Sequence, residues 1–114
     1  MKTKWYYDMH TDPHATFRAL ADPTRRDILG LLSAQHLSIG EVAEHFDMTR
    51  PAIKKHLRVL EEGHLITVTA KGRERINAIN PDGFRAVESW LSFFDRFWDD
   101  RLSALKTAVE KETK

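Results

Sequence analysis

Apolar side chains recur at spacings of three and four residues through most of this 114-residue chain, which is the pattern of amphipathic helices. Two short helices are expected to start at the Asp-Pro pairs of residues 12–13 and 22–23, because aspartate caps free backbone N–H groups and proline suits a first turn. Ser38 and Glu41 form a capping-box pattern, and the helix that they start is expected to run through Phe46. The first part of the chain is therefore predicted to be a cluster of short helices.

The segment of residues 49–62 separates apolar from basic side chains most sharply. It begins with Thr-Arg-Pro, in which the threonine is expected to cap a helix and the proline to suit its first turn. At 100° per residue, Ile53, Leu57 and Leu60 gather on one side of that helix. The opposite side carries the basic side chains, which are Arg50, Lys54, Lys55 and Arg58. One side is suited to burial and the other to a negatively charged partner.

Beyond the basic helix the period changes to two, which predicts a β-hairpin. Residues 65–69 are rich in β-branched side chains and residues 75–79 alternate between apolar and polar. A turn centred on Gly72 separates the two segments, and Pro81 ends the second strand. A short turn at residues 47–49 joins the basic helix to the one before it, as in a helix-turn-helix. The expected fold class is mainly α with a small β-hairpin: a winged helix-turn-helix over residues 13–80, with its recognition helix at 50–62 and its wing at 64–80.

Residues 1–12 precede this core as an N-terminal arm, and residues 81–114 follow it as a single long helix. No glycine or proline comes after Gly83, and a helix of about 30 residues spans about 45 Å, which is too long for one small domain to cover. Its apolar side chains form one stripe: Val87, Trp90, Leu91, Phe94, Phe97, Trp98, Leu102, Leu105, Ala108 and Val109. A second copy of the chain would bury the stripe in a two-fold homodimer. The alternatives are that the helix folds back as the core of a monomer or holds a different protein.

Composition narrows the class of protein. The chain has no cysteine, which excludes disulfides, thiolate catalysis and thiolate metal sites. The formal net charge is only +1, yet residues 49–75 hold seven lysines and arginines against three glutamates, and such a local basic block is typical of a directed anion-binding face. No apolar run is long enough to span a bilayer and no secretory signal pattern opens the sequence, so we expect a cytoplasmic protein with no membrane partner.

Three segments resemble the ArsR-type winged-helix repressors: FRALADPTRRDIL at residues 17–29, TRPAIKKHLRVL at 49–60 and, for a subgroup with an aromatic C-terminal helix, FDRFWDDRL at 94–102. The likeness extends over roughly residues 15–110. It implies a dimeric transcriptional repressor that binds double-stranded DNA, with its two recognition helices in neighbouring major grooves. It also implies that the first and last helices form the dimer interface, with the candidates Phe17, Trp90, Phe94, Phe97, Trp98, Leu102 and Leu105.

The resemblance assigns candidate DNA contacts. The family's base-reading positions fall on Arg50, Pro51, Lys54 and Lys55. Many relatives carry serine where this chain has Lys54. Lys54 could therefore contact either a base or a phosphate. Contacts to phosphate, or from the wing, are expected from Thr49, Arg58, Lys71, Arg73 and Arg75. His56 faces the apolar margin of the helix, which favours a packed histidine over a base reader.

The family's metal-sensing sites do not match this chain. One type uses cysteines at the start of the helix before the turn, where residues 37–41 read Leu-Ser-Ile-Gly-Glu, and another uses histidines of the final helix, whereas residues 81–114 hold none. His10 and His14 flank Asp12-Pro13, and proline disturbs the i, i+4 geometry that would pair them. We expect no metal and no cofactor. An unknown small-molecule effector and the absence of any effector are both open.

Two other classes compete with a DNA-binding regulator. An enzyme is not indicated, because no Gly-rich phosphate loop, nucleophile elbow or metal-ligand spacing appears. The alternative function is a protein-interaction or dimerisation module without specific DNA binding. A scaffold has no reason to carry four basic side chains opposite the apolar side of one helix and to repeat that sign at a hairpin tip. The sequence therefore predicts a sequence-specific regulator on an inverted-repeat operator.

Overall fold

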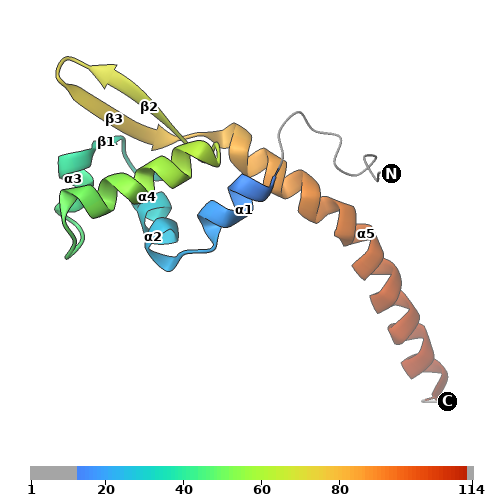
Figure 1. The fold of residues 1–114 in the computed structure, drawn as a ribbon. Helices are drawn as coiled ribbons and strands as arrows, with labels where there is room; N and C mark the ends of the chain where they lie inside the picture. Colours follow the sequence, from blue (N-terminus) through green and yellow to red (C-terminus); the bar gives the residue numbers. More distant parts are fainter. Residues whose placement is uncertain (1–12, 113–114) are drawn as a thin grey trace. The chain divides into compact units, whose positions relative to one another are not determined.

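The computed structural model describes residues 13–112, and the predicted arm of residues 1–12 lies outside them (Figure 1). Of the described residues, 13–87 belong to one compact unit and 88–112 to a second. In order along the chain, the elements are α1 (His14–Leu20), α2 (Pro23–Leu32), β1 (Leu37–Ser38), α3 (Ile39–Ala43), α4 (Arg50–Glu62), β2 (Ile66–Lys71), β3 (Glu74–Ile79) and α5 (Pro81–Glu112). The mainly helical fold with a small antiparallel sheet agrees with the predicted class.

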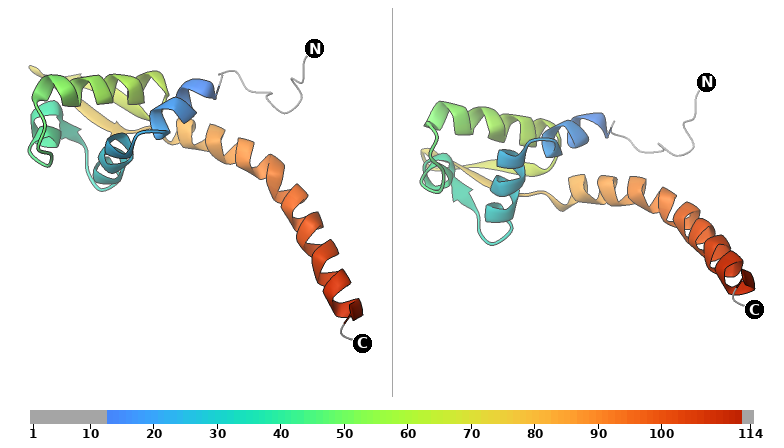
Figure 2. Two further views of the ribbon diagram at one scale, coloured as in Figure 1. Left: turned by 60° about the horizontal axis from the view of Figure 1, so that its bottom comes forward. Right: turned by 90° about the horizontal axis from the view of Figure 1, so that it is seen from below.

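Helix α4 is the central packing element of the first unit. It contacts α1, α2, α3 and β2, and Figure 2 shows it lying alongside the hairpin. Ile53, Leu57 and Leu60 are buried, as their spacing predicted, in one cluster with Ile28 and Leu32 of α2. Because burial of each such aliphatic side chain contributes about 1.5–3 kcal/mol, this side of α4 is held against the core and its other side is left to solvent.

The hairpin is part of a three-stranded antiparallel sheet in the order β1-β3-β2. Strands β2 and β3 turn at Gly72, whose φ of +64° suits glycine. The sequence pattern did not predict β1, which is only two residues long and pairs Leu37 with Asn77. Asn77 is 1% exposed, and its side-chain Nδ2 donates to the Leu37 carbonyl oxygen at 3.1 Å. The wing is thereby tied to the segment that leads into α3.

Helix α3 is shorter than predicted. It ends at Ala43 rather than running through Phe46, so the turn before α4 begins at residue 44 instead of 47. The His45 Nδ1 atom lies 2.9 Å from the Glu41 carbonyl oxygen, which is the acceptor that an α-helical His45 N–H would use. The His45 N–H donates to Val42 instead, in the i→i−3 pattern that tightens a last turn. The backbone thus leaves the α-helical pattern at His45, where the side chain lies next to the carbonyl oxygen that the N–H would otherwise use.

The predicted long C-terminal helix is confirmed, since α5 runs over Pro81–Glu112. Within residues 88–112, several large apolar side chains are exposed: Leu91, Phe93, Phe97, Trp98, Leu102, Leu105 and Val109. Trp90 and Phe94 are half-buried, with ring centroids 4.8 Å apart. Of the helices in residues 13–112, none combines the length and the apolar character that crossing a membrane requires.

Candidate nucleic-acid interface

Local hydrogen bonds fix the starts of the two helices of the helix-turn-helix. The Thr49 hydroxyl accepts from the Ala52 N–H at 3.3 Å and caps α4, as predicted. The predicted capping box is also present: the Ser38 hydroxyl accepts from the Glu41 N–H at 3.2 Å, and the Glu41 carboxylate accepts from the Ser38 N–H at 2.9 Å. Because both caps are formed by side chains close in sequence, the positions of α3 and α4 follow from short signals.

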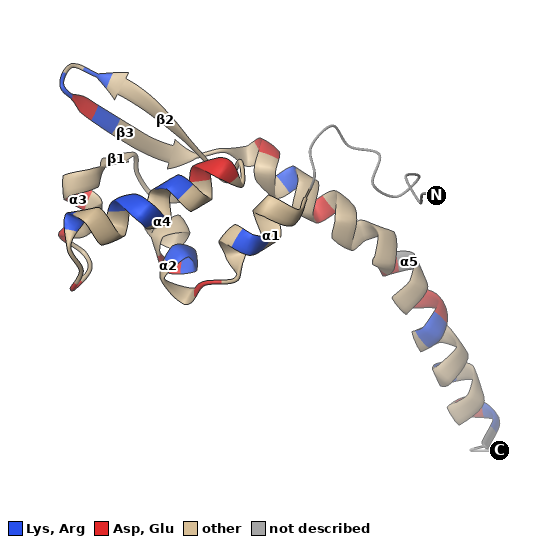
Figure 3. Cartoon of the chain, in the orientation of Figure 1, with Lys and Arg blue, Asp and Glu red and all other residues tan. Residues whose placement is uncertain are grey.

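The side of α4 opposite the core carries the candidate DNA contacts. Figure 3 shows blue bands along the first part of α4 and red at its end. All the predicted contact residues on this helix are exposed, namely Arg50, Pro51, Lys54, Lys55 and Arg58. Within residues 13–112 the ion pairs involve other residues, so these four cations carry charge that no carboxylate of the described chain neutralises at ion-pair distance. The surface is suited to an anion.

The two faces of the wing differ. Along β2 and β3, Lys71 is paired with Glu74, and alternation places both on one face of the hairpin. Arg75 lies on the other face together with the buried Asn77. The predicted wing contacts Lys71, Arg73 and Arg75 are all exposed, but only Arg75 is on the same face as the core-facing residues of β3. It therefore projects toward the helices.

Arg75 lines two surface depressions, each of which is bordered by residues of the wing and of the helix-turn-helix. One, of about 260 Å³, is lined by Ser38, Ile39, Gly40, Arg50, Arg73, Glu74 and Arg75. The other, of about 290 Å³, is lined by Ile39, Lys54, Leu57, Arg58, Glu61, Val68, Arg75 and Asn77. The structure thus brings five of the predicted cations together along the space between α4 and the wing. Lys55 and Lys71 line neither depression.

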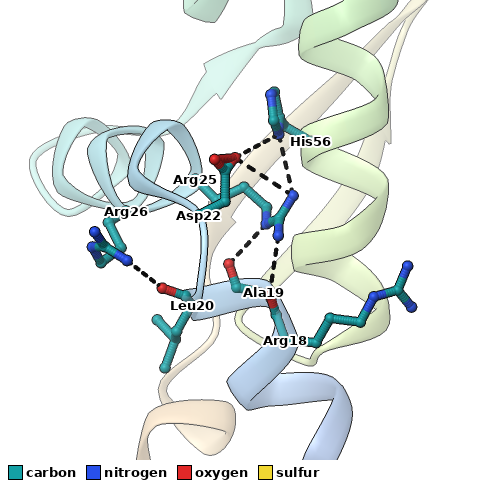
Figure 4. Close-up of polar contacts among 7 residues, drawn as sticks. All are labelled: Arg18, Ala19, Leu20, Asp22, Arg25, Arg26 and His56. Atoms are coloured by element: carbon teal, nitrogen blue, oxygen red, sulfur yellow. Dashed lines mark hydrogen bonds and ion pairs between the residues drawn. The ribbon is translucent and has the colours of Figure 1, made fainter.

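A polar cluster attaches α4 to the start of α2 (Figure 4). The Asp22 carboxylate lies 3.3 Å from His56 Nδ1 and 3.6 Å from Arg25 Nη1. Arg25 also donates to the carbonyl oxygens of Ala19 at 2.8 Å and Arg18 at 3.0 Å. His56 is therefore packed rather than directed at a groove, as expected. The expected helix cap was wrong, because the Asp22 side chain makes no capping hydrogen bond and contacts α4 instead.

Replacing Asp22 with alanine should lower the free energy of unfolding by about 1 kcal/mol, because Arg25 and His56 lose a partly buried anionic partner. The loss should shrink at high salt, which screens the pair. Asp27→Ala is the matched control, since Asp27 is an exposed carboxylate on the same helix. Urea unfolding of both variants at low and high salt measures the difference, and equal midpoints would contradict a role for Asp22 in attaching α4.

Sequence reasoning missed Gly40. This glycine lies under the Arg50 guanidinium, and a Cβ built on it would come within 2.7 Å of the Arg50 Nη2 atom. The only signal in the sequence is a residue without a side chain in the first turn of a capped helix, directly after Ser38-Ile39. That signal is weak without the three-dimensional contact.

Comparison with known proteins identifies the family. Residues 20–69 match a helix-turn-helix domain family. The HTH-type transcriptional regulator Rv2034 of Mycobacterium tuberculosis is 33% identical over 103 residues, which are 90% of this chain and 94% of that protein. The transcriptional repressor SdpR of Bacillus subtilis is 34% identical over 86 residues, 75% of this chain and 96% of that protein. A crystal structure of an ArsR family transcriptional regulator is 42% identical, with a TM-score of 0.71 over 75% of this chain and 94% of its own. The chain belongs to the ArsR family.

This ArsR-family protein is a DNA-binding transcriptional regulator with a winged helix-turn-helix fold, which confirms the class predicted from the sequence. Its family is one of regulators, not of enzymes. Across residues 13–112, no group of three or more histidine, aspartate or glutamate side chains is arranged to hold a metal ion.

Proposed function

We propose that this ArsR-family protein acts as a homodimeric repressor on an inverted-repeat operator. The observation that carries the proposal is the exposed cationic side of α4, which is flanked by the arginines of the wing. Its cations form no ion pair within 4.0 Å with a carboxylate of residues 13–112. A duplex carries closely spaced negative charges, so this surface matches its backbone. The similarity to the repressor SdpR favours repression over activation.

The proposed docking places α4 in the major groove. Pro51, Lys54 and Lys55 are then the candidates for contacts to base edges, together with Arg50. The lysines and the arginine can donate to guanine O6 and N7, whereas Pro51 can offer only apolar contact. Phosphate contacts are assigned to the side chains around them: Thr49, Arg58, Lys71, Arg73 and Arg75. Arg58 and Arg75 line the same depression between α4 and the wing, which suits one strand of backbone.

The proposed dimer uses the apolar stripe of α5. Trp98, Leu102 and Leu105 are each about 60% exposed in the single chain, and large exposed apolar side chains in a row mark an interaction surface. The candidate interface also includes the half-buried Phe17, Trp90 and Phe94 and the exposed Phe97. On an inverted-repeat operator, the two copies of α4 would occupy half-sites one helical turn of DNA apart. The absence of cysteine from the chain and of histidine from residues 81–114 leaves metal-dependent release out of the proposal.

The competing function is a protein-interaction module without specific DNA binding. Fluorescence anisotropy of a labelled mixed-sequence duplex at 50 and 200 mM salt separates the two functions. Each contact between a cationic side chain and a phosphate releases counterions from the DNA, so the affinity of a DNA-binding protein falls steeply as the salt concentration rises (roughly 10³-fold or more for six contacts). Duplex binding that weakens in this way supports the repressor. A duplex that is not retained at either salt concentration would favour the interaction module.

Lys55→Ala tests the base-reading assignment. Removal of a base contact should cost about 1–3 kcal/mol on the operator and relax the preference at one base pair. Because the operator is unknown, it is first selected from random duplexes with the wild-type protein, and the selection is repeated with the variant. Lys111→Ala is the control, since it removes an exposed lysine near the end of α5. An unchanged selected sequence for Lys55→Ala would show that Lys55 reads no base.

A further inference from the structure

The Arg50 guanidinium lies close to Gly40 of α3, with its Nη2 atom nearest. A Cβ added to Gly40 would stand 2.7 Å from Arg50 Nη2, 3.2 Å from Cζ and 3.6 Å from Nη1. Because three atoms of the guanidinium lie within 4 Å of the Cβ position built on Gly40, the group occupies the space beside the Gly40 Cα where a side chain would start. A separation of 2.7 Å is shorter than a carbon and a nitrogen tolerate without a bond, so only glycine leaves Arg50 this position.

In this position Arg50 lines the same depression as arginines of the wing, whereas Lys55 does not line it. Arg50, Arg73 and Arg75 line one depression of about 260 Å³, to which Gly40 contributes its backbone. The only carboxylate lining it belongs to Glu74, which forms no ion pair within 4.0 Å among residues 13–112. Arg50, Arg73 and Arg75 each bring a positive charge to this hollow, so an anion seated there would be attracted by all three. Planar, multidentate donors of this kind match the oxygens of a phosphate.

We propose that Arg50, Arg73 and Arg75 form a clamp for one backbone phosphate of the bound duplex, and that Gly40 is the residue that positions Arg50 in it. The inference rests on the proposed DNA docking and changes one of its assignments, because Arg50 becomes a phosphate contact instead of a base reader. Base reading from the exposed side of α4 then falls to Pro51, Lys54 and Lys55.

The clamp draws on α3, α4 and the wing together. Arg73 and Arg75 are on the wing, Arg50 begins α4, and Gly40 is in α3. The β1–β3 pairing ties the wing to the start of α3, since Ser38 is paired with Ile76 and Leu37 with Asn77. A phosphate held by all three arginines would therefore register the duplex against both the helix-turn-helix and the wing.

The test compares Arg50→Ala, Arg73→Ala, Gly40→Ala and the double variant Gly40→Ala/Arg50→Ala with the wild-type full-length chain. Anisotropy titrations use the selected operator and a scrambled duplex over a range of salt concentrations. Arg50→Ala and Arg73→Ala should each weaken binding to both duplexes by the same factor, about tenfold, and reduce the slope of log affinity against log salt by about one. Gly40→Ala should change binding and slope in the same direction, and should have no further effect once Arg50 is alanine.

Gly30→Ala is the control for a glycine-to-alanine change within a helix, because nothing lies within 4 Å of a Cβ at Gly30. It should bind as the wild type does, and thermal unfolding should show that Gly40→Ala remains folded. Either of two results for Arg50→Ala would overturn the clamp: the variant loses only its preference for the operator while the salt slope stays unchanged, or it binds both duplexes as the wild type does. Either of two results for Gly40→Ala would do the same: the variant binds as Gly30→Ala does, or its effect on binding persists when Arg50 is also alanine. The proposed docking itself fails separately, if the wild-type protein shows no salt-dependent duplex binding.

Discussion

Replacing Trp98 with alanine should raise the dissociation constant of the proposed dimer at least about ten-thousandfold. Trp98 is 59% exposed in the single chain and lies in the stripe of α5 with Leu102, Leu105 and Val109. Truncation of a buried tryptophan removes its transfer free energy and leaves a cavity, at a cost of about 3–5 kcal/mol. In a two-fold interface both copies lose the side chain, so the cost falls on the association twice.

The same substitution should weaken operator binding without touching α4. One subunit reaches only one half-site, and a dimer gains from the second half-site because its binding becomes intramolecular. Binding of the Trp98→Ala variant to the full operator should therefore approach that of a single half-site. Sedimentation velocity over a range of concentrations measures the association, and anisotropy with full and half operators measures the consequence.

Ser103→Ala is the control for the dimer experiment. At 100° per residue Ser103 lies about 140° from Trp98 around α5, and its side chain is exposed. This variant should sediment as the wild type does. If Trp98→Ala also keeps the wild-type mass at every concentration, the association does not depend on the stripe of α5. A wild-type protein that sediments as a monomer throughout would count against the dimer altogether.

The elements that the sequence predicted well are those specified by local signals. Helix α4 begins at the expected residue because Thr49 caps it and the residue pattern up to Leu60 repeats at the helical period. Helix α5 likewise follows from a long stretch without glycine or proline. Strand β1 was missed because its two residues become a strand only through pairing with Asn77, 40 residues further along the chain.

The same limit applies to the charged side chains. Like Arg50, Arg25 and Arg26 are arginines near the start of a helix. However, Arg25 donates to the carbonyl oxygens of Ala19 and Arg18, and Arg26 donates to the carbonyl oxygen of Leu20 at 2.7 Å. Their hydrogen bonds are used within the protein, whereas Arg50 borders an open depression. Charge patterning located the basic segment, but only the fold separates cations that hold the chain together from those directed outward.

At the end of α4, Gly63 is needed for close packing and not for a left-handed backbone. A glycine directly after a helix commonly adopts the left-handed backbone, but Gly63 has φ −83° and His64 has φ +61°. The His64 N–H donates to Glu61 and the Leu65 N–H to Leu60, which is a Schellman motif with His64 at C′. Gly63 is required for another reason, since a Cβ there would come within 2.8 Å of the Ala15 carbonyl oxygen of α1.

Replacing Gly83 with alanine should lower the free energy of unfolding by about 3 kcal/mol, although helix propensity alone predicts a gain of about 1 kcal/mol. Gly83 is in the first turn of α5. An alanine Cβ there would overlap the His64 carbonyl oxygen and lie 2.6 Å from the His64 carbonyl carbon. That oxygen already accepts from Asn80 Nδ2 at 3.0 Å, and the left-handed backbone of His64 limits its movement. Since the obstacle is backbone, no side-chain rotation relieves it.

Gly30→Ala separates the packing effect from propensity. It is also a glycine-to-alanine change in a helix, but nothing lies within 4 Å of the added Cβ, so the variant should be stabilised by about 0.5–1 kcal/mol. Thermal unfolding at one fixed protein concentration compares the two, because association would otherwise shift the midpoint. Both changes remove the same backbone freedom from the unfolded chain, so opposite signs can come only from the folded state. If Gly83→Ala unfolds at or above the wild-type midpoint, the start of α5 does not approach the His64 backbone as closely as this structure shows.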